Sequence, residues 1–202
     1  MKHLIIISPE ETVNEEINIV NALFDEGLQY FHLRKPHFSP AEQEMYLSRI
    51  KPQYLKNISI HQHHSADIKN QVVGFHFKES KRLKIKAIPI MRNLDTPYRR
   101  LSTSLHDADS IKTISAFWDY VFLSPIAESV SKPGYKNNKL VALKLVKSDN
   151  VPPVIALGGI TTDNAEHILL RGFDGIAVLG SIWNDSGNAI KTFRKLQRIC
   201  RN

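Results

Sequence analysis

The stretch Val154-Ile155-Ala156-Leu157-Gly158-Gly159 is a short apolar run that ends in two glycines. Further along the chain, Gly175-Ile176-Ala177-Val178-Leu179-Gly180-Ser181 repeats this pattern. Apolar runs of this length, bounded by glycine, are typical of buried strands. The residues from Thr162 to Gly172 repeat apolar side chains at helical spacing. A strand, a helix and a second strand in succession predict two parallel strands joined by a right-handed crossover.

The same alternation extends outward from this pair through the rest of the chain. The other predicted strands are His3–Ile7, Gln29–Leu33, Asn57–His61, Val72–Phe77, Leu101–His106 and Tyr120–Ser124. Predicted helices begin at Thr12, Ser39 and Thr162 and cover residues 109–117, 139–147, 180–183 and 187–199, with a weak helix after the third strand. Thr12 with Glu15, and Ser39 with Glu42, have the spacing of capping boxes. Residues 87–91 are ambiguous, because Pro89 argues against a central strand.

Eight strands, each followed by a helical stretch, fit two α/β architectures, a doubly wound sheet and a (β/α)8 barrel. The 202 residues give about 25 for each strand–helix unit, which is close to a barrel without insertions. No linker or change of composition divides the chain. We therefore predict a single domain over residues 1–202 with the (β/α)8 TIM-barrel fold.

The charge favours an anionic small molecule over a nucleic acid. The formal net charge is +7, but Lys and Arg are scattered and accompany no nucleic-acid-binding motif. A net positive charge would also suit the binding of a phosphorylated small molecule. The one cysteine, Cys200, cannot form an internal disulfide and favours a reducing compartment. Because the apolar run Leu4–Ile7 is too short for a signal peptide or a membrane span, we expect a cytoplasmic protein with no membrane partner.

Polar side chains gather where the predicted strands end, which is where barrels of this fold carry their active sites. These ends offer Arg34 and Lys35, His61 and Gln62, Lys78 and Glu79, Ser104 and His106, and Ser124, with His32 inside the second strand. His106 is the candidate for proton transfer, because a neutral imidazole can both give and take a proton. A core or rim histidine is the alternative. The histidines His32, His61, His63 and His64 are joined by no paired carboxylate at ligand spacing, so we expect no metal site.

The last two strand ends predict a phosphate site. Glycines there can expose backbone N–H groups, and the short helix over residues 180–183 can direct its first N–H groups at the same anion. The predicted phosphate-binding residues are Gly158, Gly159, Val178, Leu179, Gly180 and Ser181. Tight turns are the alternative use of these glycines. A loop with Ser129, Ser131 and Lys132 offers two hydroxyls and an ammonium group, which would suit either a lid over an anion or an ordinary surface loop.

At these residues the chain resembles the thiamine phosphate synthase/TenI family of (β/α)8 barrels. Residues 154–160 are similar to the family's strand 7 with its glycine pair, and residues 175–182 to its strand-8 phosphate segment. Asp119-Tyr120-Val121-Phe122-Leu123-Ser124-Pro125-Ile126 is similar to its strand 6. The resemblance places the family's loop threonines and lysine on Ser129, Ser131 and Lys132. It extends over nearly the whole chain.

The chain also departs from the synthase pattern. Synthases carry Gln-x-Arg-x-Lys at strand 2, where this chain has His32, Arg34 and Pro36, and their Asn-Asp pair after strand 3 becomes His61-Gln62. Their second acidic metal ligand falls near Lys81, with Glu79 close by. Magnesium prefers oxygen ligands, so these changes argue against a magnesium-dependent reaction.

Ser104-Leu105-His106 instead resembles the Ser-x-His of TenI-like thiazole tautomerases, whose histidine moves a proton. The resemblance therefore predicts an isomerase that converts a thiazole phosphate carboxylate to its aromatic form without a cofactor. His106 would move the proton, and Arg34 would hold the substrate carboxylate. Ser104 and His61 would orient the ring, with His32, Ser129, Ser131 and Lys132 as further substrate contacts.

Two alternatives remain open. One is thiamine phosphate synthase, which joins hydroxymethylpyrimidine pyrophosphate to thiazole phosphate with release of pyrophosphate and would require magnesium. The other is a catalytically silent barrel that senses the same ligand or regulates a partner. In each case the expected partner is a small phosphorylated heterocycle, and a homo-oligomer is possible.

Overall fold

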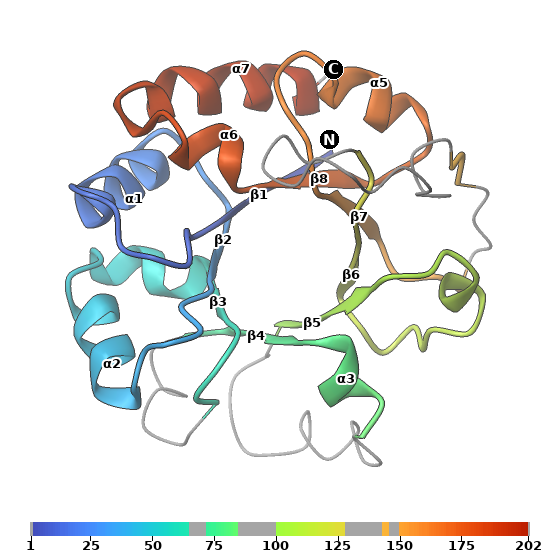
Figure 1. The fold of residues 1–202 in the computed structure, drawn as a ribbon, viewed down its shortest axis with the longest axis horizontal. Coiled ribbons are helices and arrows are strands. Elements are labelled where there is room, and N and C mark those ends of the chain that lie inside the picture. Colours follow the sequence, from blue (N-terminus) through green and yellow to red (C-terminus); the bar gives the residue numbers. More distant parts are fainter. Residues whose placement is uncertain (1, 65–71, 85–99, 128–142, 146–149, 202) are drawn as a thin grey trace.

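The computed structural model describes residues 2–64, 72–84, 100–127, 143–145 and 150–201. Eight parallel strands follow one another around a closed barrel, in which β1 pairs with both β2 and β8 (Figure 1). They are β1 His3–Ile7, β2 Tyr30–Leu33, β3 Ile58–Ile60, β4 Gly74–Phe77, β5 Arg100–Leu105, β6 Tyr120–Leu123, β7 Val154–Leu157 and β8 Gly175–Val178. The predicted (β/α)8 barrel is confirmed, and the doubly wound sheet is wrong.

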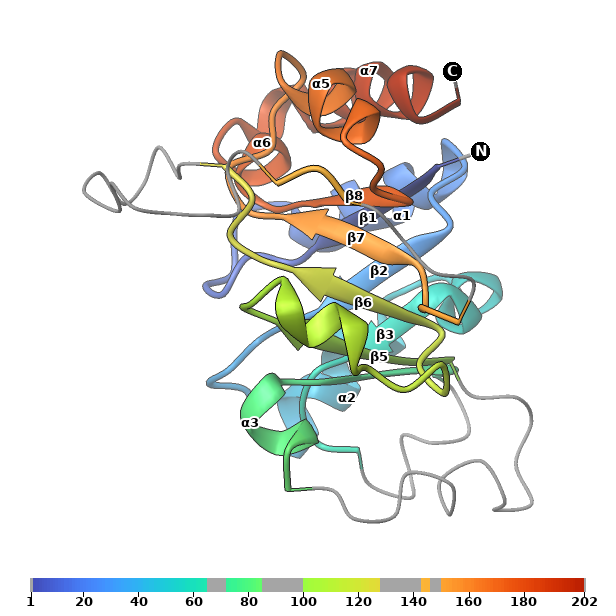
Figure 2. The same ribbon diagram turned by 90° about the vertical axis from the view of Figure 1, so that its right-hand side faces the viewer.

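Helices surround the barrel, and the connections at the carboxyl ends of the strands gather on one side (Figures 1 and 2). The α-helices are α1 Glu16–Asp25, α2 Pro40–Ser48, α3 Glu79–Arg82, α5 Ala165–Leu170, α6 Gly180–Trp183 and α7 Ala189–Arg201. Short 3-10 helices are η1 Pro52–Asn57, η3 Asp109–Lys112 and η4 Ser186–Asn188. Among the described residues, none of these helices is long and apolar enough to cross a membrane.

The capping residues at the starts of α1 and α2 test the two predicted capping boxes. The predicted capping box at Ser39 is present, because the Ser39 side chain accepts from the N–H of Glu42 and the Glu42 carboxylate accepts from the N–H of Ser39. The predicted box at Thr12 is wrong. Helix α1 begins at Glu16, after Glu15 in the left-handed conformation with φ of 57°. The Glu16 carboxylate accepts from the N–H of Val13, at 3.2 Å, and so binds the chain just before the helix.

Other predicted elements differ in length. The helix expected over residues 109–117 is only the single 3-10 turn η3, and the helix expected from Thr162 begins at Ala165. Strand β5 ends at Leu105, so His106 lies just beyond it. Residues 87–91, the helix after the third strand and most of the helix predicted over residues 139–147 lie outside the described residues, and residues 143–145 are not helical.

The barrel interior is polar on one side and apolar on the other. Side chains of a strand alternate between the two faces of a sheet, so every second residue points into the barrel. The polar interior side chains come from β2 to β5, at or just past the strands: His32, Ser59, His61, His76, Ser102 and Ser104. The apolar cluster comes from β6, β7, β8 and β1: Tyr120, Phe122, Ile155, Ala177, Ile5 and Ile7. The larger apolar core lies outside the barrel, between the strands and the helices.

A buried ion pair fastens α1 and α2 to the chain that follows β2. Lys35 Nζ lies 2.8 Å from Glu16 Oε2, and each side chain is only 1% exposed. The Tyr46 hydroxyl donates to Glu16 Oε1 at 2.8 Å. Lys35, which the sequence places among the polar groups at the strand ends, therefore has a packing role.

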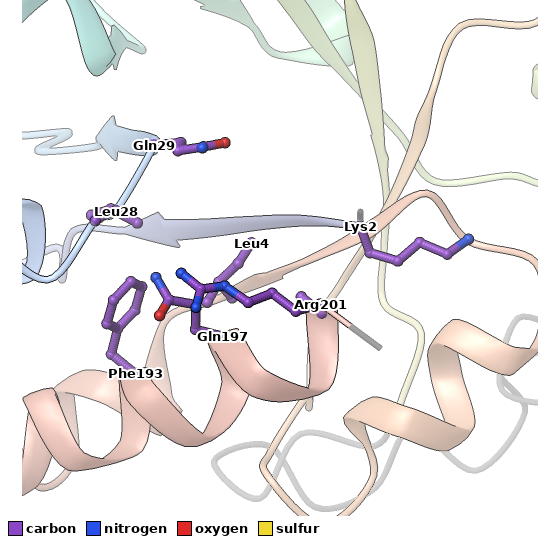
Figure 3. A pocket seen from close by; sticks show the side chains of 9 residues that line it. Lys2, Leu4, Leu28, Gln29, Phe193, Gln197 and Arg201 are labelled. Atoms are coloured by element: carbon purple, nitrogen blue, oxygen red, sulfur yellow. The ribbon is translucent and has the colours of Figure 1, made fainter.

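The amino-terminal ends of the strands hold a small cavity of about 50 Å³ next to α7 (Figure 3). Its lining is Lys2, Leu4, Gly27, Leu28, Gln29, Phe193, Gln197, Cys200 and Arg201. Burial raises the pKa of the Cys200 thiol to about 11, so that this thiol stays protonated. The cavity lies at the end of the barrel opposite the predicted site residues.

Candidate functional site

A cavity of about 550 Å³, here called the ring cavity, lies at the carboxyl ends of the strands. Arg34, His61, Ser104 and His106, which were predicted as catalytic or substrate-binding residues, line it together. The rest of the lining is Ile7, His76, Lys78, Glu79, Ser80, Phe122, Ser124, Leu157 and Leu179. Cationic and polar groups thus face the apolar side chains of Phe122 and Leu157, an arrangement suited to a flat polar ring that carries negative charge.

Arg34 is held at the rim from its main chain and from its side chain. Ser8 Oγ accepts from the N–H of Arg34 at 2.8 Å and donates to the Arg34 carbonyl at 3.1 Å. The guanidinium lies 2.5 Å from Glu10 Oε1, and both side chains are partly exposed. A guanidinium can bind a planar carboxylate or a phosphate through paired N–H donors. Arg34 can therefore exchange Glu10 for an anionic ligand at low cost.

His106 is exposed, and its ring orientation is set by Ser124. The His106 Nδ1 atom lies 3.1 Å from the Ser124 carbonyl oxygen and 3.3 Å from Ser124 Oγ. A carbonyl oxygen can only accept, so the bond at 3.1 Å places the proton on Nδ1. In the neutral ring, Nε2 then carries the lone pair.

Ser104 is linked to a histidine that the sequence reasoning missed. His76 lies in β4 and is buried, with Nδ1 at 2.9 Å from Ser102 Oγ and Nε2 at 2.9 Å from Ser104 Oγ. The period of two in Gly74, His76 and Lys78 places them on the same face of β4, and this alternation could have identified His76 as an interior residue. The Ser104 hydroxyl is thus oriented by His76 at the cavity wall.

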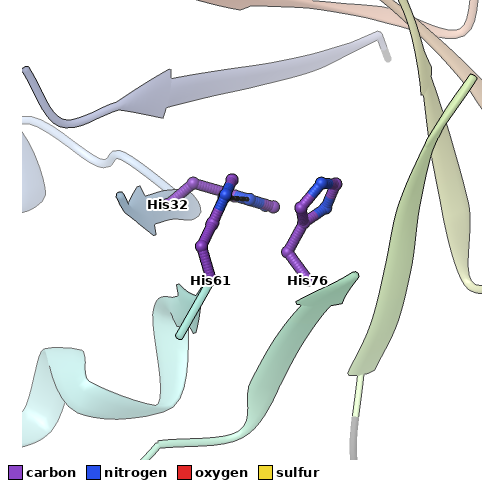
Figure 4. Close-up of side chains that lie close together, drawn as sticks. All are labelled: His32, His61 and His76. Carbon is purple, nitrogen blue, oxygen red and sulfur yellow. Dashed lines mark hydrogen bonds between the residues drawn. The ribbon is translucent and has the colours of Figure 1, made fainter. Parts of the chain in front are cut away.

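His32 lies below the ring cavity and does not line it. It is fully buried, with Nδ1 at 2.9 Å from His61 Nε2 and Nε2 at 2.5 Å from the Tyr120 hydroxyl (Figure 4). A direct contact between His32 and a ligand in this cavity is therefore not supported. His32 instead positions His61, whose ring does reach the cavity.

The interior histidines are neutral at neutral pH. Burial lowers the pKa of His76 to about 3. Burial, with the nearby His76, holds the pKa values of His32 and His61 well below the ordinary histidine value. Because the charged form is disfavoured in this interior, these rings carry lone pairs and can accept hydrogen bonds or bind metal ions.

A second cavity of about 690 Å³, here called the phosphate cavity, lies beyond the ends of β7 and β8. All six predicted phosphate-binding residues line it, namely Gly158, Gly159, Val178, Leu179, Gly180 and Ser181. Gly158 and Gly159 have positive φ angles of 99° and 65°, which glycine adopts readily. The predicted short helix is present as α6, and the first N–H groups of any helix lack partners inside that helix.

Asn164, which the sequence reasoning also missed, holds the glycine loop. Its Oδ1 accepts from the N–H of Thr161 at 2.8 Å, and its Nδ2 donates to the Gly159 carbonyl at 2.9 Å. The Ser181 hydroxyl donates to the Ile160 carbonyl and so connects this loop to α6. Ser181 therefore has a bond to the neighbouring loop, while its position keeps it in the cavity lining.

The two cavities adjoin, because Ser124, Leu157 and Leu179 line both. The carboxylates Glu10 and Asp185 also line the phosphate cavity. The predicted loop contacts Ser129, Ser131 and Lys132 lie outside the described residues.

The fold and these two adjoining cavities define a (β/α)8 barrel with its candidate site at the carboxyl ends of the strands. The chain belongs to the thiamine monophosphate synthase family, which matches residues 4–182. The resemblance of the strand-7 and strand-8 segments to this family is thereby confirmed.

Curated relatives match parts of the chain. A thiamine-phosphate synthase from Anoxybacillus flavithermus is 35% identical over 85 residues, which are 41% of this chain and 39% of the relative. One from Lactococcus lactis subsp. cremoris is 32% identical over 105 residues, 50% of this chain and 48% of the relative. The chain thus spans about half or less of the length of these relatives.

A solved structure matches almost the whole chain. The crystal structure of thiamine phosphate pyrophosphorylase from Bacteroides thetaiotaomicron is 28% identical, with a TM-score of 0.74, and covers 98% of each chain. A thiamine phosphate pyrophosphorylase from Pyrococcus furiosus, at 17% identity and a TM-score of 0.72, shares the fold. None of these relatives is named as a tautomerase.

Proposed function

We propose that the chain is an enzyme of thiamine biosynthesis that joins a phosphorylated thiazole to hydroxymethylpyrimidine pyrophosphate. The observation that supports this proposal is the pair of adjoining cavities. One is lined by the glycine segments after β7 and β8, and the other is lined in part by the cations Arg34 and Lys78. A reaction between two substrates needs two such neighbouring spaces. The names of the relatives support this reaction over the tautomerisation that the sequence alone favours.

The reaction would use the charges of the ring cavity. A C–N bond forms between the thiazole nitrogen and the pyrimidine methylene carbon, and the C–O bond to the pyrophosphate breaks. The leaving pyrophosphate takes the electron pair of that bond. Arg34 and Lys78 both line the ring cavity and can neutralise the charge that develops on the leaving group. The thiazole phosphate would be bound by the glycine segments in the phosphate cavity.

The described residues do not fit a magnesium ion in the ring cavity. Magnesium is bound by carboxylates and other oxygen donors. Among the described residues that line this cavity, Glu79 supplies the one carboxylate, and it lies 3.1 Å from Arg82. The other nearby donors are imidazoles and hydroxyls. We therefore assign the neutralisation of the leaving group to Arg34 and Lys78 and assign no step to magnesium.

A second candidate is the thiazole tautomerase, and the geometry of His106 favours it. Its Nδ1 proton is directed at Ser124, so Nε2 is the nitrogen that can remove a proton from a ring in the cavity. Ser104 lines the same cavity and can hold that ring. A proton shift needs neither a leaving group nor a divalent cation, which agrees with the single carboxylate, Glu79, among the described residues that line the ring cavity.

One set of incubations separates these functions. The purified protein is given thiazole phosphate and hydroxymethylpyrimidine pyrophosphate, with and without magnesium, and thiamine phosphate and pyrophosphate are measured. A parallel sample receives the non-aromatic tautomer of the thiazole phosphate carboxylate and is followed by NMR. Thiamine phosphate formed in equal amount to pyrophosphate supports the proposal. Aromatisation alone overturns it in favour of the tautomerase, and ligand binding without turnover overturns both in favour of a sensing barrel.

A further inference from the structure

Three buried histidines from neighbouring strands converge inside the barrel. His32 of β2, His61 just after β3 and His76 of β4 point toward one another (Figure 4), and one nitrogen from each lies within 4.8 Å of the other two. The joining reaction proposed above uses none of these three rings. From the sequence we expected no metal site, because no paired carboxylate joins His32, His61, His63 and His64 at ligand spacing.

The three rings are ready to act as ligands. A metal ion binds the neutral imidazole, since protonation occupies the lone pair. Burial keeps all three rings neutral at neutral pH, as described above. Three imidazoles without a carboxylate suit borderline ions such as Zn²⁺, Co²⁺ or Ni²⁺, whereas magnesium and calcium prefer oxygen.

Hydroxyl groups hold the ring nitrogens that face away from the cluster. Tyr120 contacts His32 Nε2 at 2.5 Å, which leaves His32 Nδ1 directed at His61. Ser102 and Ser104 contact the two nitrogens of His76, so one of them can stay bound while the other turns to an ion. Metal-binding histidines in proteins usually have such a partner on their second nitrogen, which fixes the tautomer and the ring orientation.

The distances require only small ring movements. Zn–N bonds of about 2.0–2.1 Å in a tetrahedral site place two ligand nitrogens about 3.3 Å apart. His32 Nδ1 and His61 Nε2 are 2.9 Å apart as a hydrogen-bonded pair, so they must separate by about 0.4 Å. One of these two nitrogens carries the proton of the hydrogen bond, and on metal binding this proton must move to the outer nitrogen of its ring. His76 must approach by about 1.5 Å from the outer limit of 4.8 Å. Rotation of its side chain can supply this movement.

An ion can reach the cluster from the ring cavity. His61 and His76 line that cavity, whereas His32 forms the floor beneath it. The nearby positive charges of Arg34 and Arg100, which help to lower the histidine pKa values, also weaken cation binding. Glu10 pairs with Arg34 and offsets part of this repulsion.

We propose that His32, His61 and His76 form a binding site for one borderline divalent transition-metal ion, such as Zn²⁺, with a fourth coordination position open to the ring cavity. An ion in this position would face a substrate ring directly and would present a water molecule or a substrate atom as its fourth ligand.

The test uses the full chain, stripped of metal with a chelator and then loaded with Zn²⁺ or Co²⁺. After desalting, we expect one equivalent of metal for each chain by elemental analysis. We also expect the intense visible absorption of tetrahedral Co²⁺ and a rise in Tm on addition of either ion, because binding to the folded state alone stabilises it. A wild-type chain that keeps no metal and shows no change in Tm or absorption would overturn the proposal.

Variants locate the ion. His76→Asn and His61→Asn should lose the bound metal, and Tyr120→Phe should bind it about 10–100-fold more weakly because it removes the partner of His32. The matched control is His64→Gln, which changes a nearby histidine outside the cluster and should keep one equivalent. Circular dichroism shows which variants fold. Folded cluster variants that retain a full equivalent of metal would contradict the assignment. If a variant fails to fold, the visible spectrum of wild-type protein with Co²⁺ decides whether the tetrahedral site exists.

Discussion

The His106 ring donates through Nδ1 to the Ser124 carbonyl oxygen at 3.1 Å, a bond that connects the end of β5 to the end of β6. Because main-chain carbonyl oxygens have no proton to give, this bond selects one neutral tautomer of the ring. The nitrogen left with a lone pair is the one a general base requires. Of the predicted catalytic residues, His106 is therefore the one whose neutral tautomer is set by a contact with the backbone.

Replacing His106 with Gln keeps a side chain that can donate to Ser124 but removes the basic nitrogen. If the chain aromatises the thiazole tautomer, we expect turnover to fall by about 10²–10⁴-fold, the usual contribution of general acid–base catalysis. Binding of thiazole phosphate should change little, because the glycine segments are untouched. NMR of the tautomer and calorimetric titration measure the two effects, with His167→Gln on α5 as the control. Unchanged turnover in His106→Gln would exclude the role.

Gly158→Ala tests the phosphate cavity. Gly158 has φ of +99°, and an added Cβ would lie 3.1 Å from the Cα and Cβ atoms of Pro125. Both effects displace the loop, so we expect weaker binding of thiazole phosphate and a loss of about 1–2 kcal/mol in the free energy of unfolding. Gly187→Ala is the matched control, because its added Cβ has only the Asp185 carboxylate nearby, at 3.8 Å. Equal affinities for the two variants would argue against a phosphate at this loop.

Lys35→Met leaves the Glu16 carboxylate buried without its cation. Breaking a buried ion pair from one side costs about 3–5 kcal/mol, and we expect a loss of this size in urea unfolding. Arg194→Met breaks the exposed pair with Glu26, whose side chains are 55% and 31% exposed, and should change the free energy of unfolding far less. Similar losses in both variants would contradict the packing role of Lys35.

His64 makes the stability of the fold depend on pH. Burial lowers its pKa from 6.5 to about 4, with a smaller contribution from Lys81. Between these two values unfolded His64 binds more protons than folded His64, so the contribution of this group to stability falls as the pH drops from about 6.5 toward 4 and levels off below 4. The loss from this group is about 3 kcal/mol at most. Unfolding measured from pH 7 to pH 4 should show a shallower decline for His64→Gln, and parallel curves would refute the assignment.

The fold could be predicted because the outer core follows simple patterns. Runs such as Val154–Leu157 are buried by helices, and their apolar character is visible in the chain itself. The starts of the helices could be predicted less well than the strands. Ser39 caps α2 as its motif indicates, whereas the chain before α1 turns at Glu15 and is held by Glu16, whose carboxylate is committed to Lys35 and Tyr46. Such long-range partners override a local motif.

The site was predicted where the strands end, whereas His76, inside the barrel, was missed. Arg34, Ser104 and His106 follow from counting to the carboxyl ends of strands, and they do line one cavity. His76 lies within β4, and its importance depends on partners from β2, β3 and β5 that only the barrel brings together. Asn164 acts through its contact with Gly159, which no spacing in the sequence reveals.

The barrel interior is divided into a polar half, from β2 to β5, and an apolar half, from β6 through β8 to β1. The residues of these two halves can change independently in evolution. The glycine segments of the phosphate cavity follow β7 and β8, whose interior residues Ile155 and Ala177 belong to the apolar half. The polar half from β2 to β5 can therefore exchange one functional group for another without disturbing the packing beneath the anion anchor. A lineage built on this scaffold can keep the phosphate handle of its substrates and change the reaction performed beside it.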